Sequence, residues 1–503
     1  MKKILNYHPS KWESLSFLLI PILFGFLTSS AFDNDIWFLM NTGRTILQKG
    51  FITTDIFTIH SNFSLVIQQW IPDVLFYLSY NIVGKIGPYI IANILNIYLI
   101  FITYKLLMIV TKDKRNIAVL ITFIISIIIS FSFVVARPQM FSLSILMTEL
   151  YILERYKIKN DLKILYFLPL LSILMINCHA SMWLLLFCFI VPFILDNFSF
   201  SFGSIVSYKD INSFKRLLLI TFIMFICGFI NPYGVKAITY LFTSYGVDVI
   251  NNFVTEMMVP DVHTIRGLST FLIVFGTYLF YLLFNSKKIS LRHFLLLIGT
   301  TYLAISSYRG IAFFAVAGIY PLGFYLNDKF YQIKEVKDKK YFIYFVVMII
   351  ILAFFLIFVN LNPNFLIIKS SVSDGIVEIY NKEDINKVRL YCNYGECNYA
   401  EYLGIKVYID SRAEIFLKAN NKSDDVLIEL YVLQNGGLYY KDFLNKYNFT
   451  HLLVKKTDIL YQLLLHDSDY EIMYTAKEKV KDHKLEVTSG DRYEYIVFKR
   501  IDN

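Results

Sequence analysis

The sequence predicts a polytopic α-helical membrane protein with an extracytoplasmic α/β domain at its C-terminal end. Of its 503 residues, 56% are hydrophobic and only 17% are charged, which is too apolar for a soluble protein of this size. Long apolar runs recur over the first 360 residues, and short alternating segments replace them afterwards. We therefore expect a transmembrane domain over residues 1–360 and a second domain over residues 361–503.

The apolar runs predict about eleven membrane spans. Crossing about 30 Å of hydrocarbon takes roughly 20 apolar residues, and shorter runs suffice in a bundle whose neighbours cover them. The spans are expected near 14–31, 87–110, 117–135, 140–153, 164–178, 182–196, 217–230, 267–285, 291–307, 310–327 and 341–360. The first run has the basic start of a signal peptide, but no clear small-residue cleavage site follows, so we expect it to be retained.

The placement of Lys and Arg predicts the orientation. With a cytoplasmic N-terminus, the basic clusters "TKDKRN", "ERYKIKNDLK", "YKDINSFKR", "NSKKISLRH" and "NDKFYQIKEVKDKK" all fall on the cytoplasmic side, as the positive-inside rule requires. The net charge of +9 then needs no nucleic-acid partner. We expect a multi-pass protein of the cell membrane with outer loops 32–86 and 231–266 and an extracytoplasmic C-terminal domain.

Two outer segments have helical patterns. In the first, Ile36, Leu39, Met40 and Leu47 recur at helical spacing and Gly50 is a suitable stop, which predicts a short helix lying in the membrane interface. The second, residues 235–263, is too polar in its later half to cross a bilayer and too apolar for a free loop. It predicts a pair of surface-lying helices.

The C-terminal region predicts a small α/β domain. "KVRLYC", "KVYID", "HLLVKK" and "YEYIVFK" have strand character, and residues 424–434 and 457–466 are helical. Cys392 and Cys397 lie here, and an outer location permits a local disulfide, although two free thiols fit the spacing nearly as well. A zinc site is disfavoured because no second Cys or His pair accompanies them.

Ionisable residues at membrane depth are costly and mark candidate functional sites. Topology places the candidates at one surface: Asp33, Asp35, Arg137, His179, Glu256, Asp261 and Arg309. An arginine at the outer end of a span presents a planar donor fork suited to a phosphate or carboxylate. A carboxylate facing such a site can act as a general base toward a hydroxyl group.

Structural alternatives stand beside these functions. Asp33 or Asp35 can simply cap the following helix, where a carboxylate meets backbone N–H groups and the positive end of the dipole. Arg137 and Arg309 can anchor to lipid headgroups.

The remaining polar candidates also have ordinary interpretations. A lone histidine such as His179 is more often a hydrogen-bonded structural residue than a ligand. Trp70 fits the aromatic belt of a membrane interface, although it could also line a site. Asp410 and Arg412 are the clearest charged pair of the C-terminal region, and a structural ion pair explains them best.

The stretch "DNDIWFLMNTGRTILQKGFITTDIFT", followed by "QQWIPDVLFYLSYNIVG", resembles the first outer loop of bacterial multi-spanning proteins related to the GT-C glycosyltransferase superfamily. These enzymes use polyprenyl-phosphate-linked sugars and include protein mannosyltransferases and oligosaccharyltransferases. The similarity continues in "ARPQMFS", "NCHAS", "NPYG", "FVTEMMVPDVH", "YRGIAFFAVAGIYPL" and "EYLGIKVYIDSRAEIF". It spans most of the chain and indicates a branch of the superfamily rather than one named enzyme.

The resemblance implies a GT-C-like fold and roles for several residues. Asp35 matches the acidic residue that serves as base or helps bind a metal, with Asp33 as its neighbouring acid and Glu256 as a second acid. Arg137 and Arg309 look like the residues that hold the lipid phosphate. A divalent metal, Mg²⁺ or Mn²⁺, is an open expectation, because Leu39 or Met40 stands where the family usually has His.

These observations together predict an inverting transfer of sugar from a polyprenyl-phosphate donor to an extracytoplasmic glycan, lipid or protein acceptor in the cell envelope. His179, Asp261 and Trp70 would line the site. The alternative is a transporter or flippase of lipid-linked glycans, or a non-catalytic scaffold of the same fold. A transporter needs charges along a path through both leaflets, whereas the sequence places them at one surface.

Overall fold

The chain folds into two compact units. One comprises residues 1–30 and 89–361, and the other comprises residues 31–88 and 362–503. The computed structural model describes residues 11–28, 34–244, 250, 254–284, 288–326, 371–475 and 495–501. The predicted span at 341–360 and Asp33 lie outside the described residues. Composition groups the outer loop 32–86 with residues 1–360, whereas in the structure this segment packs with the C-terminal region.

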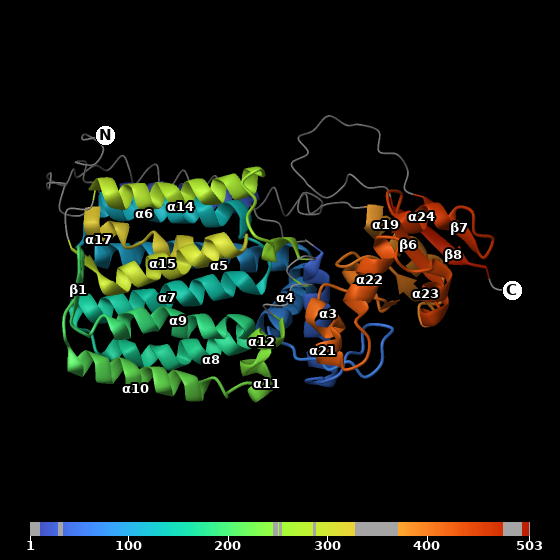
Figure 1. Cartoon of the computed structure of the whole chain (residues 1–503), viewed down its shortest axis with the longest axis horizontal. Coiled ribbons are helices and arrows are strands. Elements are labelled where there is room, and N and C mark those ends of the chain that lie inside the picture. The colour runs from blue at the N-terminus through green and yellow to red at the C-terminus, as the bar shows by residue number, and fades with distance from the viewer. Residues whose placement is uncertain are drawn as a thin grey trace. The chain divides into compact units, whose positions relative to one another are not determined.

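The first unit is a bundle of apolar helices that run alongside one another (Figure 1). Each of the ten described runs predicted as spans coincides with a helix. The helices are α2 (Lys11–Thr28), α5 (Ile86–Val110), α6 (Arg115–Ser132), α7 (Pro138–Lys159), α8 (Leu168–Cys178), α9 (Trp183–Leu195), α10 (Ile211–Cys227), α14 (Ile265–Phe284), α15 (Leu291–Ser306), and α16 (Gly310–Phe313), which a π-helical turn (Phe314–Gly318) joins to α17 (Leu322–Leu326).

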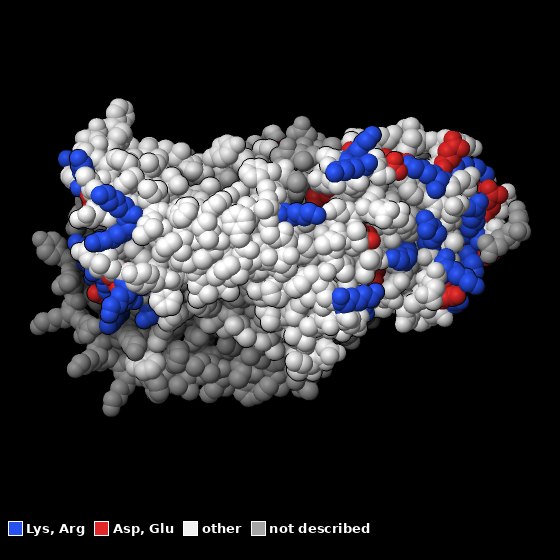
Figure 2. Space-filling view, turned by 90° about the horizontal axis from the view of Figure 1, so that it is seen from below, with Lys and Arg blue, Asp and Glu red and all other residues white. Residues whose placement is uncertain are grey.

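Two of the described helices, α5 and α14, are long and apolar enough to cross a membrane by length and composition. Six shorter described helical segments are also strongly apolar. Figure 2 shows a broad face of this unit without charged side chains, with Lys and Arg gathered at one end. These features are consistent with a membrane location, while the number of spans and the topology stay predictions.

A buried ion network joins three helices of the bundle and the turn before α17, near the C-terminal end of α7. Arg292, in the first turn of α15, bonds both carboxylate oxygens of Glu154 on α7 at 3.1 and 3.2 Å and lies 2.7 Å from Asp196 at the end of α9. His293 and Tyr320 also bond Glu154, at 2.7 and 3.0 Å. Charges buried this deeply are tolerated because each has several partners.

The end of the bundle that carries Arg137, His179, Glu256 and Arg309 has short elements. They are a 3₁₀ turn between α8 and α9 (η2, Ala180–Met182), the short helices α11 (Val235–Ile238) and α12 (Tyr240–Ser244), and a 3₁₀ turn η3 (Thr255–Met257). The predicted helix pair over 235–263 is therefore present as short helical turns where the structure describes it. Residues 245–249 and 251–253 are outside that part. At the other end, β1 (Phe200–Phe202), β2 (Ile205–Ser207) and β3 (Ile289–Ser290) form a small sheet.

The second unit is built on a five-stranded sheet of order β5-β4-β6-β8-β7. Its strands are β4 (Arg389–Tyr391), β5 (Lys406–Val407), β6 (His451–Lys455), β7 (Tyr470–Thr475) and β8 (Tyr495–Arg500). β4 pairs in parallel with β5 and β6, and β8 is antiparallel to β6 and β7. All four predicted strands are present, and β7 is an addition. The helices are α19 (Ser371–Lys382), α20 (Asn398–Tyr402), α21 (Lys418–Asn421), α22 (Val426–Gln434), α23 (Tyr440–Tyr447) and α24 (Ile459–Leu464), with a 3₁₀ turn η6 (Ala413–Phe416).

Residues 35–83 supply two more helices to this unit, α3 (Asp35–Lys49) and α4 (Trp70–Val83). The helix predicted after Asp35 is thus present, while its place in the membrane interface stays a prediction. It ends at Gly50, whose φ of 80° favours glycine. On α3, Trp37 packs against Tyr399 and Tyr402 of α20, with ring centroids 4.6 and 5.2 Å apart. The first outer loop is therefore part of the α/β unit.

A disulfide joins Cys392, directly after β4, to Cys397, directly before α20. Both half-cystines are fully buried in the core cluster that includes Leu390, Val407 and Val497. Of the alternatives that the spacing leaves open, the structure therefore shows the local disulfide.

Candidate functional site

Arg137 stands immediately before α7. Its backbone is extended, and Pro138 occupies the first position of the helix, where its missing N–H costs nothing and its fixed φ suits the helix. The side chain of Arg137 is 24% exposed, so it is partly shielded from water but still accessible.

Arg309 is held by a tight turn between α15 and α16. Gly310 follows it, and a Cβ atom at position 310 would lie 1.7 Å from the carbonyl oxygen of Leu303. Only glycine allows this approach, so the motif "YRG" fixes the backbone on which Arg309 is carried. The turn is also pinned to η3, because the N–H of Tyr308 donates to the carbonyl oxygen of Met258 (3.0 Å).

Glu256 on η3 lies between the two arginines. Its Oε1 is 2.5 Å from Nη1 of Arg137, and its Oε2 is 2.5 Å from Nη2 of Arg309. Three residues separated by more than fifty positions from one another thus converge on one carboxylate. The sequence predicts all three as site residues, and the structure brings them together.

The charge environment of Glu256 is strongly positive. Burial alone raises the pKa of this carboxyl, but Arg137 and Arg309 outweigh burial and lower the pKa to about 2, with a smaller contribution from Arg266. A carboxylate with so low a pKa is a weak general base at neutral pH. The geometry therefore suits Glu256 better as the counter-ion of the arginine pair than as the base.

A small cavity lies beside this cluster. Its volume is about 20 Å³, and Gln139 and Arg266 line it together with the three charged residues. That space holds about one water molecule, so a phosphate fits only if the side chains move apart. Arg266 and Gln139 are contributors that sequence reasoning missed, although Arg266, the single arginine of the outer loop 231–266, was a usable signal.

Asp261 has a local structural role. Its Oδ1 accepts the N–H of His263 (2.9 Å), and its own N–H donates to the hydroxyl of Tyr308 (3.1 Å). Arg266 lies over the ring of Tyr308, 5.0 Å from its centroid. These contacts tie the turn at 261–266 to the one that carries Arg309, so Asp261 positions the site from its edge.

His179 is buried between α8 and α9, and its Nδ1 is 2.7 Å from the hydroxyl of Ser142 on α7. Burial, helped by the charge of Arg309, lowers the pKa of His179 to about 3, so the ring is neutral at physiological pH. It can accept or donate one hydrogen bond there but cannot serve as a cation. The contact with Ser142 matches the structural interpretation.

Glu149, in the middle of α7, does not fit the expectation that charges collect at one surface. Its side chain is fully buried, and neither carboxylate oxygen has a hydrogen-bond partner among the described residues. It lies twelve positions after Arg137, which corresponds to about 18 Å along the helix. Sequence reasoning missed it because a single acid inside the apolar stretch "ILMTELYIL" interrupts the run only briefly.

The other predicted acids belong to the second unit. Asp35 is the first residue of α3 and is half-buried, with Asn34 in the capping position and no side-chain cap bond from it. An acid in the first turn meets the positive end of the helix dipole. Asn398 fixes this helix start by donating to the carbonyl oxygen of Asn34 (2.9 Å). A role for Asp35 in chemistry stays a prediction.

Trp70 begins α4 and packs edge-on against Phe51, with ring centroids 5.4 Å apart. This contact fixes the segment that precedes α4. It gives Trp70 a packing function within the second unit, and a role in lining a site stays a prediction.

A buried charge cluster occupies the interior of the second unit. Arg412 bonds Asp410 through Nε at 3.0 and 3.1 Å and Asp55 through Nη2 at 2.9 Å, and it is only 7% exposed. Burial alone raises the pKa of Asp55, but Arg412 and Thr58 outweigh burial and lower it. The expected Asp410–Arg412 ion pair is therefore present, and Asp55 from the first outer loop completes it.

Two further acids are buried near this cluster. The side chain of Asp73 on α4 is fully buried, and neither carboxylate oxygen has a hydrogen-bond partner among the described residues. Burial raises its pKa well above the ordinary value. Burial also raises the pKa of Glu401, whose Oε1 accepts a hydrogen bond from Asn41 (2.9 Å). Sequence reasoning missed both, although an acid within the apolar "WIPDVLFY" was a signal for Asp73.

No group of three or more His, Cys, Asp or Glu side chains suited to a metal ion occurs within the described ranges. Asp33 is outside them. The metal expected from the resemblance stays a prediction, and no step below depends on it.

No family model and no curated protein matches this sequence. Solved structures do match. The Archaeoglobus fulgidus oligosaccharyltransferase tethered with an acceptor peptide containing the NVT sequon aligns with 89% of this chain and 69% of its own, at 12% identity and a TM-score of 0.51. The apo form of that enzyme gives a TM-score of 0.49 (12% identity, 89% and 70% covered), and its complex with an inhibitory peptide and a dolichol-phosphate gives 0.47 (12%, 88% and 69%).

The first of these likenesses shows the fold. The chain has the architecture of an oligosaccharyltransferase, which supports the GT-C-like fold that the resemblance implies. At this level of identity the likeness says nothing of donor, acceptor or site residues.

Proposed function

We propose that the protein is a membrane glycosyltransferase of the GT-C type that transfers a sugar from a polyprenyl-phosphate donor. The observation that carries this proposal is the convergence of Arg137 and Arg309 on one carboxylate at one end of the bundle. Two guanidinium groups that hold an anion this closely form a ready site for a phosphate. The oligosaccharyltransferase fold supports the same class of reaction.

In the proposed reaction an acceptor group attacks the anomeric carbon from the face opposite the phosphate. The new bond to the acceptor forms as the bond between the anomeric carbon and the phosphate oxygen breaks, and the phosphate keeps the electron pair. Arg137 and Arg309 stabilise the negative charge that grows on the leaving phosphate. Asp35 acts as general base and takes the proton that the attacking acceptor group, a hydroxyl or an amide nitrogen, gives up. Configuration at the anomeric carbon inverts.

Glu256 is the exchangeable counter-ion in this scheme. It holds both arginines while no donor is bound, and a donor phosphate replaces its carboxylate. An uncompensated pair of half-buried guanidinium groups would be costly, so the carboxylate keeps the empty site stable and ordered.

The acceptor is a glycan, a lipid or a protein. The Archaeoglobus enzyme is tethered with an acceptor peptide in its structure, which makes an asparagine-containing peptide the first acceptor to test. A glycan acceptor and a lipid acceptor are the next two.

The decisive assay measures sugar transfer from a purified polyprenyl-phosphate sugar by the full chain in detergent or nanodiscs. Asp35→Asn should abolish transfer while donor binding persists. Arg137→Lys and Arg309→Lys should raise KM for the donor more than for the acceptor, because a lysine cannot replace the planar fork. Transfer that survives Asp35→Asn in a folded protein would refute the base, and equal losses for donor and acceptor would refute the phosphate site.

A flippase of lipid-linked glycans is the second candidate, and Glu149 favours it. An acid buried halfway along α7, with no partner among the described residues, is the kind of group that a transport path uses. In proteoliposomes, a flippase should move a labelled lipid-linked glycan between leaflets without breaking the glycosidic bond, and Glu149→Gln should slow that movement. A glycosyltransferase should cleave the bond and tolerate Glu149→Gln in a folded protein.

A further inference from the structure

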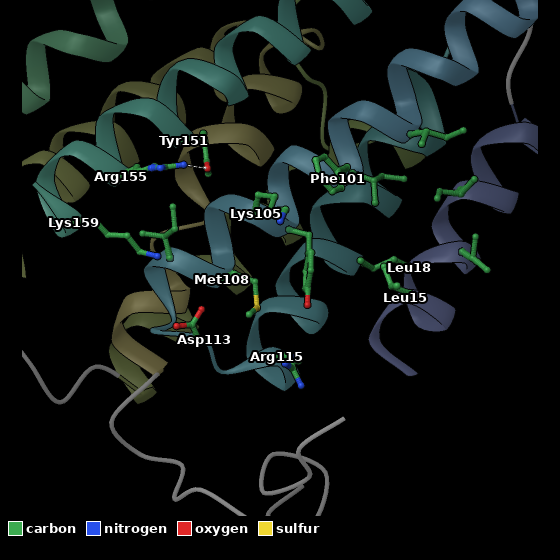
Figure 3. A pocket seen from close by; sticks show the side chains of 16 residues that line it. Leu15, Leu18, Phe101, Lys105, Met108, Asp113, Arg115, Tyr151, Arg155 and Lys159 are labelled. Carbon is green, nitrogen blue, oxygen red and sulfur yellow. Dashed lines mark hydrogen bonds between the residues drawn. The ribbon is translucent and has the colours of Figure 1, made fainter. Parts of the chain in front are cut away.

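An elongated pocket lies on the side of the bundle between α2, α5 and α7 (Figure 3). Its volume is about 630 Å³, and it lies entirely within the first unit. It is separate from the arginine pair, because its contributions from α7 are the residues of the last turns whereas Arg137 precedes the first. From Arg137 to Arg155 the helix rises about 27 Å, close to the thickness of a bilayer's hydrocarbon.

The long walls of the pocket are apolar. Lining residues recur at helical spacing on each of two helices, so one face of each turns toward the pocket. They include Leu15, Leu18 and Ile22 on α2, and Ile97, Phe101 and Met108 on α5. From Ile97 to Met108 the groove follows α5 for about 16 Å, which is about half of the hydrocarbon thickness. The groove is therefore one leaflet deep.

The end of the pocket near the helix termini is cationic. Lys105 from α5, Arg115 from the first turn of α6, and Arg155 and Lys159 from α7 line it, with Asp113 as the one acid among the lining residues. In Figure 3 the labelled Arg155 and Lys159 lie on one side of the pocket and the labelled Leu15 and Leu18 lie on the other. The balance of charge at this end favours an anion.

Arg155 has one hydrogen-bond donor that no described residue uses. Its Nη2 lies 2.8 Å from Asp161 and its Nη1 donates to the hydroxyl of Tyr151 at 2.9 Å, but its buried Nε has no partner among the described residues. Arg155 and Lys159 are four positions apart and lie on the same face of α7, as does Tyr151. A phosphate at this end would thus meet two positive charges and a phenol from one helix.

We propose that this groove binds an acidic phospholipid of the leaflet at this end of the bundle, with an acyl chain along α2 and α5 and the phosphate among Lys105, Arg115, Arg155 and Lys159. The depth of one leaflet, the apolar walls and the cationic mouth are together what an anionic amphiphile requires, and basic pockets between membrane helices are known to hold such headgroups. The positive-inside rule places this end at the cytoplasmic surface.

The test uses the full chain in phosphatidylcholine nanodiscs that contain a photoactivatable phosphatidylglycerol. Peptides from α5 and α7 should carry the label, and phosphatidylglycerol should compete far better than phosphatidylcholine. Arg155→Gln combined with Lys159→Gln should weaken competition roughly thirtyfold, since each basic residue near the surface contributes about a factor of five. Ile97→Trp, which fills the apolar part, should reduce labelling without a change of charge.

Lys215→Gln combined with Arg216→Gln is the matched control, because these exposed residues of α10 remove the same charge without lining the groove. Equal competition by the two phospholipids, or equal losses in the control and in the Arg155/Lys159 pair, would overturn the proposal. Stronger competition by a polyprenyl phosphate than by phosphatidylglycerol would overturn the phospholipid assignment. Size-exclusion profiles identify any variant that has failed to fold. If the Arg155/Lys159 variant fails to fold, the labelling of Ile97→Trp tests the proposal independently.

Discussion

Arg309 and Glu256 are joined twice. The backbone N–H of Arg309 donates to the carbonyl oxygen of Glu256 at 3.1 Å, and its Nη2 lies 2.5 Å from Oε2 of the same residue. The main-chain bond holds η3 against the turn between α15 and α16 whatever the side chains do. The carboxylate can therefore leave the guanidinium groups without the loss of the local fold.

Glu256→Gln separates the role of counter-ion from the role of base. As a counter-ion, the carboxylate competes with the donor phosphate, so its neutral replacement should lower the Kd for a polyprenyl phosphate by about fivefold to tenfold, equivalent to roughly 1 kcal/mol. The measurement is binding of a labelled polyprenyl phosphate to purified protein. Unchanged donor binding together with a complete loss of transfer would instead assign Glu256 as the base.

Gly310→Ala should displace Arg309. The added Cβ meets the carbonyl oxygen of Leu303 at 1.7 Å, so the backbone must shift, at a cost of about 1–3 kcal/mol in the free energy of unfolding and with impaired use of the donor. Gly299→Ala, in α15, is the matched control because its Cβ meets nothing within 4 Å. Thermal unfolding in detergent compares the two. Equal stability of both variants would show that the turn at 310 relaxes freely.

Arg412→Met should destabilise the second unit strongly. It leaves Asp55 and Asp410 buried without their counter-ion, which costs about 3–5 kcal/mol. Lys387→Met serves as the control, because Lys387 is 85% exposed and its ion pair with Asp384 should contribute little. A denaturant titration, in which limited proteolysis detects the unfolding of residues 371–475, measures the difference in free energy of unfolding. If Arg412→Met lowered the free energy of unfolding by less than about 1 kcal/mol, water would have to solvate Asp55 and Asp410 in place of the arginine.

Asp73→Asn should change how stability depends on pH. Because burial raises the folded pKa of Asp73, its contribution to stability is complete below the unfolded pKa of about 3.9 and is lost as the pH rises toward the folded value. The free energy of unfolding of the variant should therefore increase relative to that of the wild type as the pH rises above about 4, by at most about 1.4 kcal/mol per pH unit. Unfolding measured across a pH series tests this, with the exposed Asp442→Asn as a control that should show no such gain. If the variant instead became more stable than the wild type as the pH falls, the pKa of Asp73 would be lowered and not raised in the folded protein.

Local patterns in the sequence predict most of the helices of the bundle. The ten described apolar runs coincide with helices of the bundle because each run contains its own periodicity and its own boundaries, such as Pro138 at the first position of α7. The strands β4, β5, β6 and β8 are predictable for the same reason. The edge strand β7 is not, because five of its six residues are exposed or half-exposed and no clear apolar alternation remains.

The site is partly predictable. Arg137, Glu256 and Arg309 can be identified because each is an ion beside an apolar run, and topology places them at one surface. Their pairing cannot be read from the sequence, since it depends on contacts between distant turns. The Arg412 cluster illustrates the limit: its partner Asp55 stands 357 positions earlier, in a segment whose composition reads as a polar loop.

The union of residues 31–88 with residues 362–503 in one unit has a consequence for biogenesis. The early segment leaves the ribosome and must wait while the whole helical bundle between the two parts is synthesised, which takes roughly 14 to 55 s at ordinary rates of translation. Throughout that interval the carboxylate of Asp55 lacks Arg412, and the ring of Trp37 lacks Tyr399 and Tyr402. Newly made chains therefore pass through an immature form with apolar surface uncovered outside the bundle, and a C-terminal fragment made alone would lack two of its helices.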